Sequence, residues 1–124
     1  MTSVEVRVTH SVDLVDFLSI SADGSEVEMT ISDDMDWSDP EGHLAYLQDK
    51  VYRYLDFVAS GEIHERYPRA RGLRLIIRIR MDLEPPATAG EVIERIAKTA
   101  REEGVGMEVR VSGSRPKQVT PGDA

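Results

Sequence analysis

Apolar and polar residues alternate in several short stretches of this chain, and alternation with a period of two predicts β-strands. The clearest stretch is 73–81, where every second residue is apolar, and 27–31 shows the same pattern. Segments 15–20 and 27–31 flank Asp23-Gly24, a pair typical of tight hairpin turns, so they are expected to form a hairpin. Shorter strands are predicted at 107–111 and, as a possible extra N-terminal strand, at 4–8.

A helical period replaces this alternation after residue 39. Ser38 or Asp39 can cap the N-terminus of the predicted helix, Pro40 suits its first turn, and Gly61 ends it. Apolar residues at spacings of three and four draw one stripe along it: Leu44, Leu47, Val51, Leu55 and Val58.

A second helix is predicted after the capping-box sequence Thr88 to Glu91, and a glycine at 104 or 106 ends it. Its apolar face is formed by Val92, Ile93, Ile96 and Ala100.

The resulting order is β-β-α-β-α-β, with the possible N-terminal strand in front. Each strand has a single apolar side, so both helices should cover the same face of the sheet. The predicted fold class is α+β: a two-layer sandwich with a mainly antiparallel sheet of about four to five strands. We expect one domain over residues 1–111 and a disordered polar tail over residues 112–124.

Composition narrows the function classes. The 124 residues include no cysteine, which excludes disulfides and thiol chemistry, and no segment has the apolar length of a membrane span. The N-terminus lacks a signal peptide's apolar block, so a cytoplasmic protein without membrane association is expected. The net charge of −8 argues against nucleic-acid binding and permits a basic protein partner.

Acidic residues crowd the start of the first predicted helix: Asp33, Asp34, Asp36, Asp39 and Glu41, followed by His43. Oxygen ligands of this kind could bind a divalent cation. The spacing does not fit a calcium loop, because Asp39 stands where glycine is needed. Helix-dipole stabilisation and capping explain the acids more simply, and no metal or cofactor is predicted.

His43 is the main candidate for chemistry, since nearby carboxylates could orient its imidazole. No serine or cysteine nucleophile in a recognisable context accompanies it. A histidine packed beside Trp37 is the favoured interpretation, so no catalytic residue is predicted and the balance is against an enzyme.

Two further groups of side chains have both a structural and a functional interpretation. The aromatic residues of the first helix can close the core edge or form an exposed partner patch: Tyr46, Tyr52, Tyr54 and Phe57. The arginines of the sheet can bind an anion or RNA, or form cross-strand ion pairs with Glu26, Glu28 and Glu108: Arg74, Arg78, Arg80 and Arg110.

The chain also resembles a known family. The resemblance runs through T-I-S-D (30–33), D-W (36–37), H-L-x-x-L-Q-x-K (43–50), Y-x-x-F-x-x-S-G-E (54–62) and Tyr67-Pro68. These motifs are similar to those of a small bacterial family of unknown function, number 6572. The family usually has histidine where this chain has Met35, which counts against a metal or acid–base role at that position. The resemblance implies a bacterial protein of compact α+β type and supplies no activity.

The leading functional hypothesis is a non-catalytic protein–protein interaction module of accessory, regulatory or immunity type. Its candidate surface is the start of the first helix and two tyrosines: Asp33, Asp34, Asp36, Trp37, His43, Tyr46 and Tyr52. Alternatives are a small-ligand or divalent-metal-dependent sensor or enzyme using His43, Asp36 and Glu41, and a homo-oligomeric structural protein.

Overall fold

The computed structural model describes residues 4–7 and 17–111. The predicted tail at 112–124, residue 8 of the first predicted strand and residues 15–16 of the second lie outside this part of the chain. The elements follow in the order β1 (Val4–Arg7), β2 (Phe17–Ile20), β3 (Glu26–Asp33), α1 (Pro40–Ala59), α2 (Glu62–Arg66), β4 (Arg74–Met81), α3 (Gly90–Glu102) and β5 (Val105–Val111). Short 3-10 turns at Pro68–Ala70 and Ala87–Ala89 precede β4 and α3.

The five strands form one sheet in the order β1-β2-β3-β4-β5. β1 pairs with β2, and β2 with β3, in antiparallel fashion. The pair of β2 and β3 is the hairpin that Asp23-Gly24 predicted. The expectation of a mainly antiparallel sheet is wrong for the other half, because β3, β4 and β5 are parallel. Each of the last two strands follows a helix, and a helical crossover returns the chain to the end at which the previous strand began.

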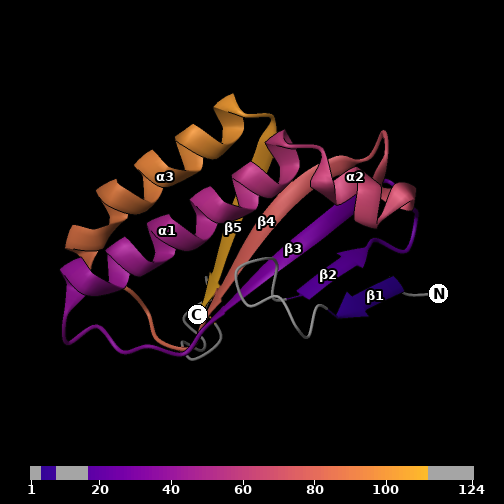
Figure 1. The fold of residues 1–124 in the computed structure, drawn as a ribbon. Coiled ribbons are helices and arrows are strands. Elements are labelled where there is room, and N and C mark those ends of the chain that lie inside the picture. Colours follow the sequence, from indigo (N-terminus) through magenta and orange to yellow (C-terminus); the bar gives the residue numbers. More distant parts are fainter. Residues whose placement is uncertain (1–3, 8–16, 112–124) are drawn as a thin grey trace.

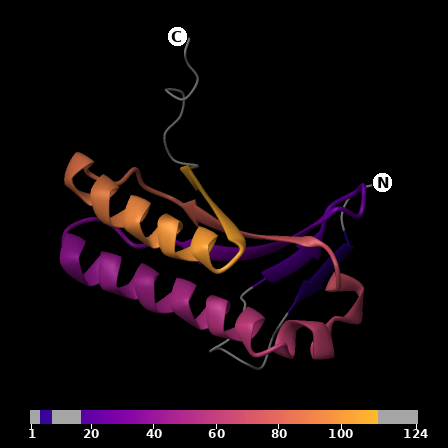
Figure 2. The same cartoon turned by 90° about the horizontal axis from the view of Figure 1, so that it is seen from above.

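The predicted α+β two-layer sandwich is confirmed. α1 and α3 lie side by side over one face of the sheet (Figures 1 and 2). Within the described residues 4–7 and 17–111, the opposite face carries no helix. Among residues 4–7 and 17–111, the helices lack the combination of length and apolar character that a membrane span requires.

The core lies between the sheet and the two long helices. Alternate residues of β3 and β4 point into it, and residues from the stripe of α1 meet them: Val27, Met29, Ile31, Ile77, Ile79, Met81, Leu47, Val51 and Leu55. Leu44, predicted to belong to the stripe, is only half-buried, whereas Tyr54 and Phe57 are buried. The Tyr54 hydroxyl donates a hydrogen bond to the carbonyl of Thr30 over 3.3 Å, so this ring closes the core as one of its two interpretations predicted.

The two long helices begin differently. Asp39 caps α1, and its Oδ1 accepts a hydrogen bond from the Gly42 N–H over 3.2 Å. The predicted capping box of the second helix is not formed. Thr88 lies inside the 3-10 turn that leads into α3, and the N-cap position falls to Ala89, which has no polar side chain to bond with.

Candidate functional site

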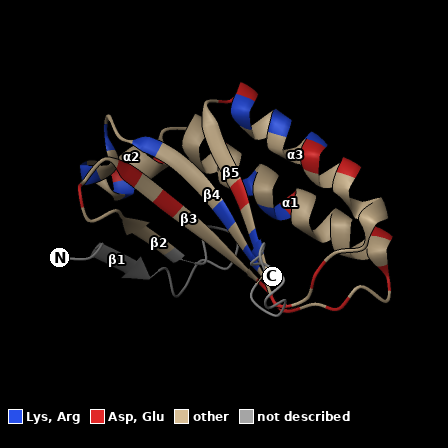
Figure 3. Ribbon diagram, turned by 180° about the vertical axis from the view of Figure 1, so that it is seen from behind, with Lys and Arg blue, Asp and Glu red and all other residues tan. Residues whose placement is uncertain are grey.

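The carboxyl ends of β3, β4 and β5 meet at one edge of the sheet, because these strands are parallel. β3 continues there into the acidic loop 34–39, and β4 continues into the loop 82–86. Figure 3 shows charged positions gathered near this edge. These strand ends and the loops that follow them carry most of the residues that the sequence singled out.

Asp33 and His43 form a buried pair behind the acidic loop. Asp33 is the last residue of β3, His43 lies in the first turn of α1, and the two are 2% and 1% exposed. His43 Nε2 lies 2.5 Å from Asp33 Oδ2, and Nδ1 lies 3.0 Å from the carbonyl oxygen of Asp36. A carbonyl oxygen can only accept, so Nδ1 is the donor to Asp36, and Nε2 is bonded to the Asp33 carboxyl group. Both residues were predicted to belong to the interaction surface, but both are buried and neither is accessible to a partner in this conformation.

Asp33 also holds the backbone of both loops. Its Oδ1 accepts a hydrogen bond from the Met35 N–H over 3.0 Å. Its main-chain carbonyl accepts another from the Asp82 N–H over 2.9 Å. The sequence did offer a signal for its burial, since position 33 continues the inward series of Val27, Met29 and Ile31.

Trp37 connects the acidic loop 34–39 with the loop 82–86. Its ring stacks on the His43 imidazole with 3.7 Å between centroids and 23° between planes, as the packed interpretation of this histidine predicted. Its Nε1–H donates to the carbonyl of Leu83 over 3.2 Å. The indole is half-buried, with one side against the histidine.

Asp34 and Asp36 lie on the outside of the same loop and are exposed. Asp36 Oδ1 accepts hydrogen bonds from the Ser38 hydroxyl over 2.7 Å and from the Ser38 N–H over 3.1 Å. These bonds, chiefly the one from the hydroxyl, hold the pKa of Asp36 below its ordinary value. Asp36 is therefore ionised at neutral pH.

Two exposed apolar residues at this edge were missed by the sequence reasoning. Met35 is 38% exposed and Leu83 is 48% exposed. Neither belongs to a periodic stretch, so the pattern of the chain gives no signal for them. We name the surface formed by Asp34, Met35, Asp36, Trp37 and Leu83 the acidic loop edge.

Tyr46 and Tyr52 are exposed on α1, at 38% and 40%, but they do not share one patch. Six residues apart on a helix, they point about 120° away from each other. Tyr52 lines a shallow groove between α1 and α3 with Asp56 and Thr99. Of the two, only Tyr46 lies within one turn of His43 on α1.

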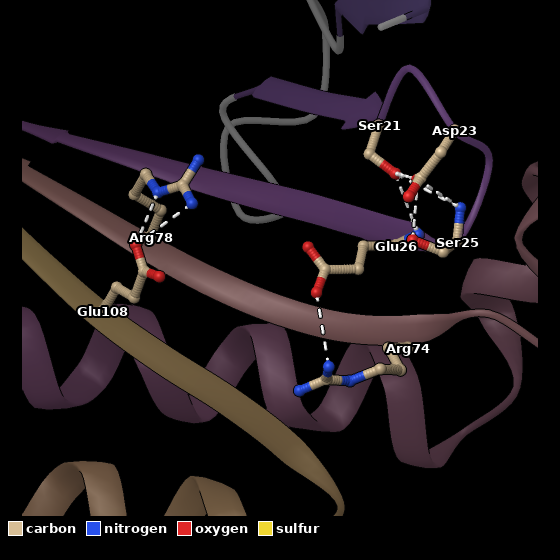
Figure 4. Close-up of polar contacts among 7 residues, drawn as sticks. All are labelled: Ser21, Asp23, Ser25, Glu26, Arg74, Arg78 and Glu108. Atoms are coloured by element: carbon tan, nitrogen blue, oxygen red, sulfur yellow. Dashed lines mark hydrogen bonds and ion pairs between the residues drawn. The ribbon is translucent and has the colours of Figure 1, made fainter.

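Ion pairs connect the strands on the face without helices. The Arg78 guanidinium lies 3.0 Å from Glu108, and Arg74 lies 3.5 Å from Glu26 (Figure 4). Arg78 also lies 2.6 Å from Glu28. The hydrogen bond from Arg78 is the main reason that the pKa of Glu108 lies below its ordinary value. The predicted cross-strand pairing is thus found for Arg74 and Arg78.

Metal ligands are not gathered at this edge: within residues 4–7 and 17–111, no group of three or more His, Asp or Glu side chains is placed to hold a metal ion.

Comparison with known proteins gives a family. The model of a family of unknown function, DUF6572, matches residues 8–113, which is most of the chain and includes α1 and the acidic loop edge. No match was found among curated proteins or among solved structures. The chain therefore belongs to the family of unknown function DUF6572.

Proposed function

We propose that this protein is a non-catalytic interaction module that binds a basic protein partner through the acidic loop edge. The observation that carries the proposal is the placement of exposed Met35 and Leu83 beside the exposed carboxylates of Asp34 and Asp36. Methionine and aromatic side chains are enriched at protein interfaces, and complementary charge speeds encounter with a basic partner.

The rigidity of the surface supports this proposal. Trp37 is held from two sides, by the His43 ring and by the Leu83 carbonyl. Asp33 fixes the start of the loop through the Met35 N–H. A surface that is already ordered binds without the entropy loss of ordering a loop, so more of the contact energy appears as affinity.

The state of His43 favours a structural role over a catalytic one. Both ring nitrogens are engaged, Nε2 with Asp33 and Nδ1 with Asp36, and the ring is 1% exposed. A general base needs a free nitrogen within reach of a substrate proton, and this conformation offers none. We further propose a bacterial cytoplasm as the setting, which suits a chain without cysteine.

The experiment is affinity capture of the tagged protein from its host, at low and moderate salt, with identification of bound proteins by mass spectrometry. We expect a stoichiometric partner rich in lysine or arginine at its contact surface, which higher salt releases. The variant Asp34→Lys/Asp36→Lys should lose it, and Met35→Ser/Leu83→Ser should weaken it.

The matched control is Glu94→Lys/Glu102→Lys, which makes the same change of charge at exposed positions of α3. It should retain the partner, and urea unfolding should show that every variant is folded. Equal capture by the wild type and Asp34→Lys/Asp36→Lys would overturn the proposal, and so would a protein that captures no partner at either salt concentration.

A further inference from the structure

The three parallel strands end in a row of polar side chains on the face of the sheet that carries no helix. The register pairs Ser32 of β3 with Arg80 of β4, and Arg80 with Arg110 of β5. Paired residues on neighbouring strands point to the same face, and the strands are about 4.8 Å apart. The two arginines are therefore direct neighbours, and Figure 3 shows basic positions on both strands near the C end of the sheet.

The acidic side chains on this face do not neutralise the charges of Arg80 and Arg110. Glu28 and Glu108 are both bonded to Arg78, one row further back. Arg110 has only a 3.4 Å contact with the same oxygen of Glu108. In the part of the chain that the structure describes, no acid forms an ion pair with Arg80. Like charges directly opposite each other on neighbouring strands are destabilising, and a bound anion would remove this repulsion.

A cavity of about 420 Å³ lies over the row. It is lined by Ser32, Arg80, Asp82, Arg110 and Val111. This volume falls within the range of small-molecule sites, and open sheets often bind ligands at the carboxyl ends of parallel strands. Among the lining residues that the structure describes, two arginines stand against one acid, Asp82.

We propose that this cavity binds the phosphoryl group of a small phosphorylated molecule. Arg80 and Arg110 each present a planar fork of donors, which matches the oxygens of a phosphoryl group. The Ser32 hydroxyl can donate to a third oxygen. The chemistry favours a small anion over RNA, because Glu28, Glu108 and Asp82 would repel a long phosphate backbone along this face.

This inference is independent of the proposed interaction module, since the cavity and the acidic loop edge share no residue. Partner binding at the acidic loop edge and phosphoryl binding in the cavity are therefore tested separately.

The test is a titration of the ¹⁵N-labelled protein with inorganic phosphate and, separately, with glycerol 3-phosphate at low ionic strength, followed by NMR and calorimetry. We expect saturable shifts at the amides of Ser32, Arg80 and Arg110. Arg80→Gln and Arg110→Gln should each weaken binding by about tenfold, the effect of losing a charge-assisted hydrogen bond. Asp82→Asn should tighten it, because a repelling carboxylate is removed.

Arg74→Gln is the matched control, since it removes an exposed arginine from the far end of the same strand and should leave binding unchanged. Shifts that do not saturate, or affinities that Arg80→Gln and Arg110→Gln leave unchanged, would overturn the site. Tighter binding of a single-stranded RNA oligonucleotide with the same variant effects would replace the small ligand by a nucleic acid. Met35→Ser/Leu83→Ser should retain phosphate binding, so that failure here and failure of the interaction module can be told apart.

Discussion

Asp33 and His43 are ten residues apart in sequence and form a buried pair with 2.5 Å between Oδ2 and Nε2. The pair fastens the last residue of the central strand β3 to the first turn of α1. Both residues are withdrawn from bulk solvent, since they are at most 2% exposed. Removing either residue therefore leaves a buried polar atom of the other, Oδ2 of Asp33 or Nε2 of His43, without this partner.

We expect His43→Ala to lower the free energy of unfolding by about 3 kcal/mol or more, the usual cost of breaking a buried pair. Asp33→Ala should cost a similar amount. Urea unfolding measures both. The double variant should cost clearly less than the sum of the single variants, because it leaves neither partner alone. A loss below about 1 kcal/mol in His43→Ala would show that the pair carries little of the stability.

The cap of α1 makes a prediction about Gly42. Replacing glycine by alanine at an exposed helical position usually stabilises by up to about 1 kcal/mol. Here the added Cβ would collide with Asp39 Oδ2 and lie 3.0 Å from Asp39 Cγ, so the capping carboxylate must turn away. We expect Gly42→Ala to bring no gain in the free energy of unfolding, because losing the cap costs about 1 kcal/mol.

The same substitution should stabilise once the cap is absent. In an Asp39→Ala background, Gly42→Ala should recover up to about 1 kcal/mol, as glycine replacement does elsewhere. Thermal and urea unfolding of the four proteins in this cycle measure the difference. Equal effects of Gly42→Ala in both backgrounds would contradict the steric explanation.

Local patterns predicted the elements of this fold well, because alternation and helical spacing depend on residues that are neighbours in sequence. They identified the strand at 73–81, the helix after Asp39 and the single covered face of the sheet. They did not give the parallel pairing of β3, β4 and β5, which depends on where each helix returns the chain.

The sequence indicated where along the chain the candidate site lies, but not which side chains contact one another there. The acidic residues before α1 lie at the edge on which our proposed function rests. Asp33 and His43 are buried and bonded to each other across the loop. Such a contact between residues ten positions apart follows no periodic pattern of the sequence, so the pattern could not predict it. Leu83 joined the site only because the Trp37 indole reaches its carbonyl over 46 positions of sequence.

The pair of Arg78 and Glu108 makes stability depend on pH in the acidic range. The folded pKa of Glu108 lies below the ordinary glutamate value of 4.5. The contribution of Glu108 to the free energy of unfolding is therefore fully present above pH 4.5 and is lost as the pH falls through the folded pKa. Because Glu108 is 42% exposed, solvent screening keeps the contribution below about 1 kcal/mol.

Arg78→Gln should raise the pKa of Glu108 toward its ordinary value and flatten this part of the pH profile. NMR titration of the Glu108 carboxyl group measures the pKa, and urea midpoints between about pH 3 and 6 measure the profile. Arg74→Gln should leave the Glu108 titration unchanged. An unchanged pKa in Arg78→Gln would assign the shift to the other arginine in contact, Arg110.

Gly106 gives Ile76 its place on the face without helices. Ile76 is only 9% exposed there, although its neighbours on that side of β4 are arginines. A Cβ at position 106 would lie 3.0 Å from Ile76 Cγ1, so Gly106→Ala should lower the free energy of unfolding by about 1–3 kcal/mol through overpacking. Shortening the neighbour with Ile76→Ala should remove this penalty, and urea unfolding of the double variant measures the coupling. If Gly106→Ala instead stabilises the protein beside an intact Ile76, the loss of unfolded-state entropy outweighs the contact, and the steric explanation for this glycine is wrong.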